Sequence, residues 1–160
     1  MTDHDDRAKV AELVKEFEIG MLTTIDESGR LVSRPMARQH KEFDGNLWFL
    51  TERGTRKVHD LSLNPTAAMS FAGDGTWLTI SGRLEVVDDR AVVKDLWDAG
   101  ASAYLPQGPD DESVVALKLV GEHAEYIDNP LGRIATAFSF VSALVTGQPF
   151  EAAEEGTTDL

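Results

Sequence analysis

The sequence predicts a mainly β (α+β) fold of six to seven antiparallel strands with flanking helices, arranged as a small closed or partly split β-barrel. Short apolar segments with a period of two recur along the chain, which is typical of strands with one buried face. The early segments are joined by turns too short for a parallel crossover, so neighbouring strands are expected to run antiparallel. Amphipathic segments with helical spacing stand at the ends and between groups of strands.

The N-terminal third begins with an amphipathic helix and continues as strands. Apolar side chains recur at helical spacing at Val10, Leu13, Val14 and Phe17. Residues 19–26 and 31–39 are expected to be strands joined by the turn sequence ESGR. Asp44-Gly45 is a strong hairpin signal, so residues 47–52 are expected to return beside 31–39.

The remaining chain repeats this pattern of strands and short helices. The expected elements are a short helix at 55–63, strands at 66–73 and 76–87, a capped helix at 88–100, a strand pair at 113–128 and a final helix from Pro130. Asp74-Gly75 supplies the tight turn between the two middle strands. One domain is therefore expected over residues 1–146, followed by an acidic, mobile tail at 147–160.

Composition limits the classes of function. The chain has 160 residues, of which 42% are hydrophobic, enough for one domain with a real core. It contains no cysteine, and its histidines lack metal-ligand spacing, so no disulfide and no metal site is predicted. Apolar runs are too short for a membrane span and the polar N-terminus lacks a signal pattern, which predicts a cytoplasmic protein without membrane contact.

Positive charge is concentrated in one part of this acidic chain, whose formal net charge is -13. Residues 30–57 hold seven of the 15 Lys and Arg residues but only three of the 28 acids, so the window carries +4 and the remainder -17. A patch of this size suits one small anion, and the acidic remainder argues against a nucleic-acid partner.

The sequence GTRK at residues 54–57 stands where a helix is expected to begin. Free backbone N–H groups at a helix N-terminus, a hydroxyl from Thr55 and the cations of Arg56 and Lys57 would form a socket of phosphate size. Arg34 and Arg38 lie two strand steps apart on one face of the neighbouring hairpin and are expected to reach the same anion. The alternative is a solvated helix turn whose cations offset nearby acids.

Several motifs, in this order and spacing, resemble the FMN-binding split-barrel superfamily, and most closely its general stress protein 26-like branch, related to pyridoxamine 5'-phosphate oxidase. They are VSRPMA, LWFLTE, GTRKVHDLSLNP and WLTISGRLEVV, followed by WDAGASAYLPQGPDDESVVALKLVGEHAEYID. The likeness runs from about residue 5 to residue 130. It implies the split form of the barrel, an antiparallel split β-barrel of six to seven strands with flanking helices.

The resemblance implies a set of cofactor-binding residues. Thr55, Arg56 and Lys57 match positions that hold the flavin phosphate, and Arg34 matches a strand residue that reaches the same phosphate and the ribityl chain. The strand residues beside the isoalloxazine ring would be Pro35, Met36 and Ala37 on one side and Trp48, Phe49, Leu50 and Thr51 on the facing strand. Thr51 would bind the ribityl or phosphate end.

The function implied by the resemblance is that of a homodimeric FMN-binding protein with the cofactor at the subunit interface. The resemblance implies a flavin-dependent oxidoreductase that takes electrons from a reduced nicotinamide donor and acts on a small-molecule redox substrate. FAD or deazaflavin F420 is an alternative cofactor, and a non-catalytic flavin-binding stress or sensor protein is an alternative role. A cofactor-free adaptor for an acidic partner is a third class.

Two departures from the resembled proteins limit the expectation. The chain lacks the C-terminal Arg/Trp segment with which vitamin-B6 oxidases hold their substrate phosphate, so a true pyridoxine-phosphate oxidase is not expected. The EYWD motif usual in the stress-protein branch is EYID here, with Ile127 in place of Trp. No residue of the sequence stands out as a general acid, base or nucleophile, so the catalytic residues are left unassigned.

Overall fold

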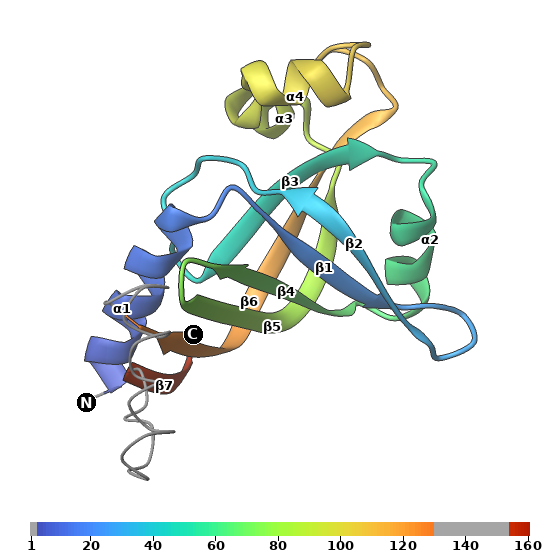
Figure 1. Ribbon diagram of the computed structural model, residues 1–160. Helices are drawn as coiled ribbons and strands as arrows, with labels where there is room; N and C mark the ends of the chain where they lie inside the picture. The colour runs from blue at the N-terminus through green and yellow to red at the C-terminus, as the bar shows by residue number, and fades with distance from the viewer. Residues whose placement is uncertain (1–2, 130–153) are drawn as a thin grey trace, which may run out of the picture.

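The protein is described by a computed structural model over residues 3–129 and 154–160. An antiparallel sheet of seven strands dominates it, which confirms the predicted fold class (Figure 1). The strands are β1 (Ile19–Ile25), β2 (Leu31–Ala37), β3 (Asn46–Glu52), β4 (Thr66–Gly73), β5 (Thr76–Val87), β6 (Val114–Asp128) and β7 (Glu154–Asp159). The helices are α1 (Asp3–Glu16), α2 (Arg56–Leu63), α3 (Arg90–Leu96) and α4 (Ala99–Tyr104).

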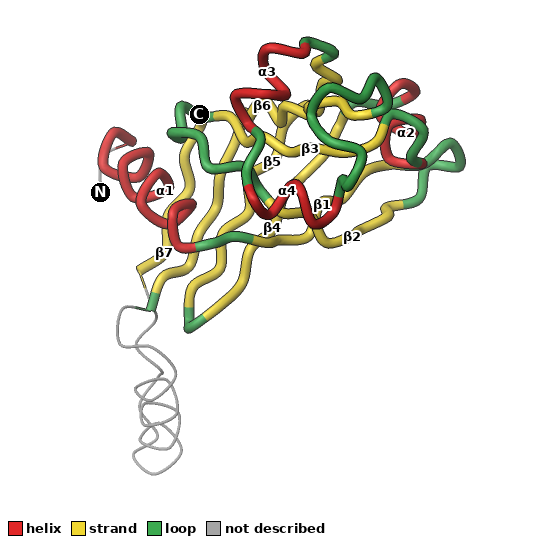
Figure 2. Tube along the Cα trace, turned by 90° about the horizontal axis from the view of Figure 1, so that it is seen from above, coloured by secondary structure: helices red, strands yellow, loops and turns green. Residues whose placement is uncertain are grey.

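The hydrogen-bonded order β2-β1-β4-β5-β6-β3, with β7 also beside β6, leaves the barrel split. Strands β2 and β3 end this path and do not form a ladder with each other. Helices α1 and α2 lie at opposite ends of the sheet, and α3 and α4 form a small lobe over one side (Figures 1 and 2). The gap between two edge strands is where such a sheet leaves room for a ligand.

Two predicted hairpins are confirmed. Strands β1 and β2 pair along their full length, and the turn between them is held by the Asp26 side chain, which accepts hydrogen bonds from the N–H groups of Ser28 and Arg30 at 2.9 and 3.0 Å. Strands β4 and β5 are joined at Asp74-Gly75, where both residues have positive φ, 50° and 89°. That conformation explains the choice of an Asp-Gly pair.

The hairpin predicted at Asp44-Gly45 is wrong. Strand β3 pairs with β6, from Asn46 opposite Val120 to Glu52 opposite Val114, and not with β2. The carbonyl of Gly45 accepts a hydrogen bond from the N–H of Gly121 at 3.0 Å, so the turn at Asp44-Gly45 places the start of β3 beside β6. Residues 114–119 of β6 are mostly apolar and buried, whereas β2 is more exposed. Pairing with β6 therefore buries β3 better than pairing with β2 would.

The strand pair predicted at 113–128 is one continuous strand, β6. Its first half pairs with β3 and its second half with β7, while β5 follows it throughout with a register shift at Ser81/Gly82. Backbone atoms approach closely at this bulge, since a Cβ on Gly82 would lie 2.0 Å from the Val120 carbonyl oxygen. The bend lets one strand serve both parts of the split sheet.

Two apolar clusters form the core. The larger lies between α1 and the sheet and includes the predicted helix face of Val10, Leu13 and Val14. The smaller supports the α3–α4 lobe through Leu50, Val93 and other buried side chains. The single helix predicted at 88–100 is two short helices, because Asp89 and Asp98 each accept an N-capping hydrogen bond and so start separate helices.

The prediction of a mobile acidic tail at 147–160 is wrong for its last residues. Residues 154–159 form strand β7, which pairs antiparallel with the end of β6, from Glu154 opposite Asp128 to Asp159 opposite His123. Its sequence, EEGTTD, lacks the apolar alternation on which strand predictions depend. The final helix predicted from Pro130 lies outside the described residues.

His123 ties β7 to β6. Its Nδ1 lies 3.1 Å from Asp159 Oδ1, and its Nε2 lies 3.0 Å from Thr157 Oγ1 and 3.4 Å from Glu125 Oε1. The hydrogen bond to Asp159 is the main cause that raises the pKa of His123 above its ordinary 6.5, and the two carboxylates add to it. The imidazolium form therefore stabilises this strand pair.

We expect the attachment of β7 to weaken as the pH rises. A raised folded-state pKa gives stability that is fully present below the unfolded-state pKa and is lost as the pH passes the folded-state value. His123→Gln should therefore lower the thermal midpoint more at about pH 5.5 than at about pH 8.5. Thermal unfolding of both proteins at the two pH values measures this; an equal effect at both would show that the charge of His123 is irrelevant.

Candidate functional site

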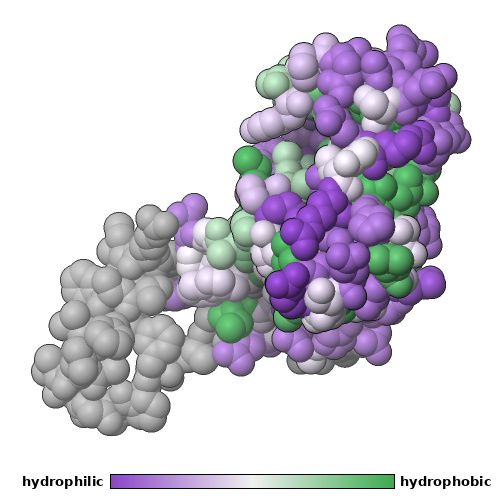
Figure 3. Space-filling view, turned by 90° about the vertical axis from the view of Figure 1, so that its right-hand side faces the viewer, coloured by the Kyte–Doolittle hydropathy of each residue, from purple (hydrophilic) through white to green (hydrophobic). Residues whose placement is uncertain are grey.

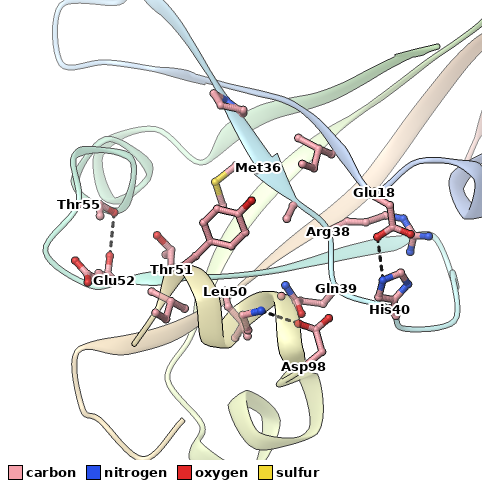
Figure 4. A pocket seen from close by; sticks show the side chains of 17 residues that line it. Glu18, Met36, Arg38, Gln39, His40, Leu50, Thr51, Glu52, Thr55 and Asp98 are labelled. Carbon is pink, nitrogen blue, oxygen red and sulfur yellow. Dashed lines mark hydrogen bonds and ion pairs between the residues drawn. The ribbon is translucent and has the colours of Figure 1, made fainter. Parts of the chain in front are cut away.

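A cavity of about 650 Å³ opens between the ends of β2 and β3 and helix α4. Figure 4 shows Met36 of β2, Leu50 and Thr51 of β3 and Asp98 before α4 around one space. The main chains of the two strand ends meet at a single hydrogen bond, from Gln39 N to the Trp48 carbonyl at 2.7 Å. The cavity thus occupies the split of the barrel.

Helix α2 begins at one end of this cavity with free backbone donors. Thr55, which lines the cavity, has an extended conformation before the helix, and its hydroxyl donates to the Glu52 carbonyl at 2.9 Å instead of capping the helix. Among the described residues, the N–H groups of Arg56 and Lys57 have no acceptor. Such a helix start attracts an anion.

Three cations surround this helix start. Lys57 is half-buried, and burial first and the nearby charge of Arg34 second lower the pKa of its ammonium group. No described residue forms a hydrogen bond or an ion pair with its Nζ atom. Burial likewise lowers the pKa of Arg34; the charge of Asp60 opposes this shift, and the charge of Arg56 adds to it. Like charges held close together form a place where an anion would be stabilised.

The protein's own carboxylates offset these cations only in part. Arg34 donates to Thr24 Oγ1 at 2.7 Å, and its NH2 lies 3.9 Å from Asp60 Oδ2, a buried oxygen without a hydrogen-bond partner. Arg56 pairs with Asp26 at 3.2 Å, although Asp26 is already held by its own turn and by Arg30. Hydrophilic side chains cover much of the molecular face that carries α2 (Figure 3).

The structure brings together most of the predicted cofactor-binding residues. Pro35, Met36, Ala37, Leu50, Thr51 and Thr55 line the cavity. The cations of Arg34, Arg56 and Lys57 lie close together beside the α2 end of the cavity. This follows because the charge of Arg56 lowers the pKa of Arg34, and the charge of Arg34 lowers the pKa of Lys57.

Two predicted ring-wall residues do not line the cavity. Phe49 is fully buried in the main core, and the indole of Trp48 lies beneath the ammonium groups of Lys41 and Lys118, 4.9 and 5.5 Å from its ring centre. The expectation that Arg38 joins Arg34 on one anion is also wrong. Arg38 lies beyond β2, where its side chain turns away and donates to the Phe17 carbonyl.

Sequence reasoning missed the opposite end of the cavity. There the side chains of Gln39 and Asp98, and Glu18 with its Oε2 atom 2.9 Å from His40 Nε2, complete the lining (Figure 4). Tyr104 of α4 also lines the cavity. Asp98 had a detectable signal, because an Asp before a small-residue helix is typical of an N-cap. The others lie in loops or on a short helix and become neighbours only through the fold.

Neither a group of metal-ligating side chains nor a membrane-spanning helix is found among the described residues. Within 3–129 and 154–160, no group of three His, Asp or Glu side chains is arranged to hold a metal ion. Asp110, one member of an acidic loop, pairs with Lys94 at 2.7 Å, and this hydrogen bond lowers the pKa of its carboxyl group. No helix in the same ranges is long and apolar enough to cross a bilayer.

The described residues thus form a split antiparallel barrel of mixed α and β structure, with a cationic helix start beside a partly apolar cavity. The family model described as pyridoxamine 5'-phosphate oxidase like matches residues 5–151. The chain belongs to that family, which confirms the resemblance found in the sequence motifs.

Three proteins illustrate the similarity. Protein bli-3 from Neurospora crassa is 29% identical over 147 residues, which cover 82% of this chain and 69% of that protein. The crystal structure of a protein assigned to general stress protein 26 from Jannaschia sp. CCS1 matches with a TM-score of 0.76 and 25% identity, over 98% of this chain and 99% of the other. A pyridoxamine 5'-phosphate oxidase-related, FMN binding protein from Nostoc punctiforme matches with a TM-score of 0.60 and 14% identity, over 98% and 95%, and so shares the fold.

Proposed function

We propose that the protein binds FMN in this cavity and is a flavin-dependent oxidoreductase. The observation that carries the proposal is the half-buried ammonium group of Lys57, which lacks a partner among the described residues and lies near Arg34 at a helix start with free N–H groups. A doubly charged phosphate would satisfy all of these donors at once. The fold shared with the FMN binding protein of Nostoc punctiforme is consistent with it.

The residues present fit the two parts of the cofactor. Arg34, Arg56, Lys57 and the hydroxyl of Thr55 would hold the phosphate, and Thr51 the ribityl chain. The apolar wall of Met36 and Leu50 would cover the flat ring and exclude water from it. Bound FMN would supply electron and hydride transfer, while these side chains anchor and orient it.

A titration of the purified protein with FMN tests the proposal. We expect saturable binding, with the visible flavin absorbance perturbed and the fluorescence changed as the ring enters the cavity. FAD and F420 titrated in parallel should bind more weakly, because their phosphates carry further groups that the socket beside Gly54 has to accommodate. Oxidation of reduced nicotinamide cofactors by the FMN-loaded protein separates an enzyme from a flavin carrier, and absence of FMN binding would overturn the proposal.

We also propose a homodimer with the cofactor at the subunit interface. Three large apolar side chains are exposed in a line across one sheet face: Ile19 on β1, Trp77 on β5 and Ile127 on β6, with exposures of 54%, 49% and 40%. Trp77 and Ile127 are direct register partners. Ile19 lines both a hollow beside Trp77 and the cofactor cavity, so a second copy on this face would also border the cavity.

A further inference from the structure

Helix α2 contains a buried carboxylate that has no part in the function proposed above. Asp60, in the middle of the helix, is 1% exposed, and its Oδ2 atom has no hydrogen-bond partner. The side chain does not line the cavity, so a ligand bound there would not reach it. Burying a carboxylate costs folding free energy unless its charge is compensated, so the structure should contain a cation that explains it.

Arg34 of β2 is that cation. Its NH2 atom lies 3.9 Å from Asp60 Oδ2, and within residues 3–129 and 154–160 no other cation is at ion-pair distance from this carboxylate. Strand β1 holds the guanidinium through NH1, which donates to Thr24 Oγ1 at 2.7 Å and to the Leu22 carbonyl at 3.3 Å. A separation of 3.9 Å allows attraction but no hydrogen bond, so the N–H groups of NH2 stay available for an anion.

The place of Arg34 needs such an anchor, because neighbouring cations repel it. Burial disfavours the charged form and lowers the pKa of Arg34, the carboxylate of Asp60 raises it again, and the charge of Arg56 lowers it. Lys57 is close as well, since the charge of Arg34 lowers the pKa of its ammonium group. Without Asp60, repulsion from both cations would favour a guanidinium turned away from the start of α2.

We propose that Asp60 is a positioning residue, which holds the Arg34 guanidinium beside Lys57 at the start of α2 and does not itself contact the flavin phosphate. The role exists only if FMN binds there, so this inference rests on the proposed function. It reverses the effect expected from charge alone. A carboxylate near a bound dianion should weaken binding, whereas a carboxylate that positions a phosphate-binding arginine should strengthen it.

FMN titrations of Asp60→Asn and of the matched control Asp128→Asn test the sign of this effect. Asp128 is also buried, but it pairs with Lys9 of α1 at 2.6 Å, at the end of the sheet away from α2 (Figure 1). We expect Asp60→Asn to bind FMN at least about 10-fold more weakly than the wild type, and Asp128→Asn to stay within about 2-fold. Unchanged or tighter FMN binding by Asp60→Asn would overturn the inference.

Riboflavin separates the phosphate from the ring, because it has the same ring and ribityl chain without the phosphate. Its affinity should be the same within about 2-fold in the wild type and in Asp60→Asn, since Arg34 is proposed to act on the phosphate. An equal loss of affinity for riboflavin and FMN would assign Asp60 to the general architecture of the cavity and would overturn the positioning role.

A double variant shows whether Asp60 acts through Arg34. In Arg34→Ala no guanidinium remains to be positioned, and only the repulsion between the carboxylate and the phosphate is left. Arg34→Ala/Asp60→Asn should therefore bind FMN as well as Arg34→Ala or up to about 3-fold more tightly. This comparison also serves if Asp60→Asn alone does not fold, because the double variant removes both members of the pair. A further loss of about 10-fold would contradict coupling through Arg34.

A measurement on the ligand-free protein distinguishes failure of this inference from failure of the proposed function. The Nε–H signal of Arg34 in a proton–nitrogen NMR spectrum, identified by its absence in Arg34→Lys, should be sharp in the wild type and in Asp128→Asn but shifted and broadened in Asp60→Asn. If the wild type binds FMN while Asp60→Asn changes neither this signal nor the affinity, only the positioning role falls. If the wild type does not bind FMN, the proposed function falls and the role of Asp60 with it.

Discussion

Arg56→Ala/Lys57→Ala is expected to lower the affinity for FMN at least about 100-fold. Hydrogen bonds to a charged group are each worth about 1.5–3 kcal/mol, and every 1.4 kcal/mol changes a dissociation constant about tenfold. Both side chains lie at the start of α2, where the free N–H groups remain in the variant, so binding should be weakened rather than abolished. Fluorescence titration with FMN measures the change.

The matched control is Arg83→Ala/Lys94→Ala. It changes the net charge by the same amount, but each side chain already pairs with its own carboxylate, Glu122 at 3.1 Å or Asp110 at 2.7 Å, outside the cavity. FMN affinity should stay within about 3-fold in the control, because only the long-range field changes. Comparable losses in both double variants would show that the overall charge, and not a socket at α2, attracts the flavin.

Differences in folding stability between the two double variants should not affect the comparison of their FMN affinities. The ion pair of Arg56 with Asp26 joins a side chain that is 64% exposed to one that is 1% exposed, and the Asp26 carboxylate keeps Arg30 as a second partner at 3.1 Å in the variant. Asp26 also keeps the hydrogen bonds from the Ser28 and Arg30 main chains that hold its turn. A thermal midpoint close to that of the wild type is expected for both double variants, which circular dichroism can confirm before binding is measured.

Local sequence signals predicted the features that depend on neighbours in the chain. The cations of Arg56 and Lys57 adjoin the start of α2, so spacing alone predicted that they lie at a helix start. Asp74-Gly75 and Asp44-Gly45 carry the same turn signal, yet only the first closes a hairpin. The difference comes from a residue far along the chain. The N–H of Gly121 donates a hydrogen bond to the Gly45 carbonyl, and β3 therefore pairs with β6.

Features set by distant contacts had no signal that could be read in sequence. Strand β7 has few apolar residues, and its place depends on the free edge of β6 and on His123. Gln39 follows two predicted site positions but became notable only when the fold buried its amide without a partner. A buried and unpaired polar group is a property of the three-dimensional neighbourhood, and the sequence motifs carry no signal for it.

The second large effect is expected at the apolar row on the sheet. The wild-type chain of 17.5 kDa should have twice that mass in solution, and Trp77→Asp/Ile127→Asp should have the mass of one chain. In a dimer these two register partners would be buried together, and an unpaired carboxylate at such a contact costs several kcal/mol. Size-exclusion chromatography with light scattering measures both masses.

Leu63→Asp provides the control, because Leu63 at the end of α2 is 58% exposed and lies outside the row. It should keep the dimer mass, whereas an equal loss in this variant would point to nonspecific apolar association. By the resemblance to the stress-protein branch, a tryptophan is expected where Ile127 stands here. If the row is the contact, Ile127→Trp should therefore keep the dimer together at lower protein concentration. A monomeric wild type would contradict the interface outright.

The monomeric variant also tests where the flavin is. Ile19 borders both the row and the cofactor cavity, so a partner on this face would close one side of the cavity against water. We therefore expect Trp77→Asp/Ile127→Asp to bind FMN at least about 10-fold more weakly than the wild type, although neither residue lines the cavity. A monomer with unchanged FMN affinity would place the whole binding site within one chain and leave the dimer without a part in it.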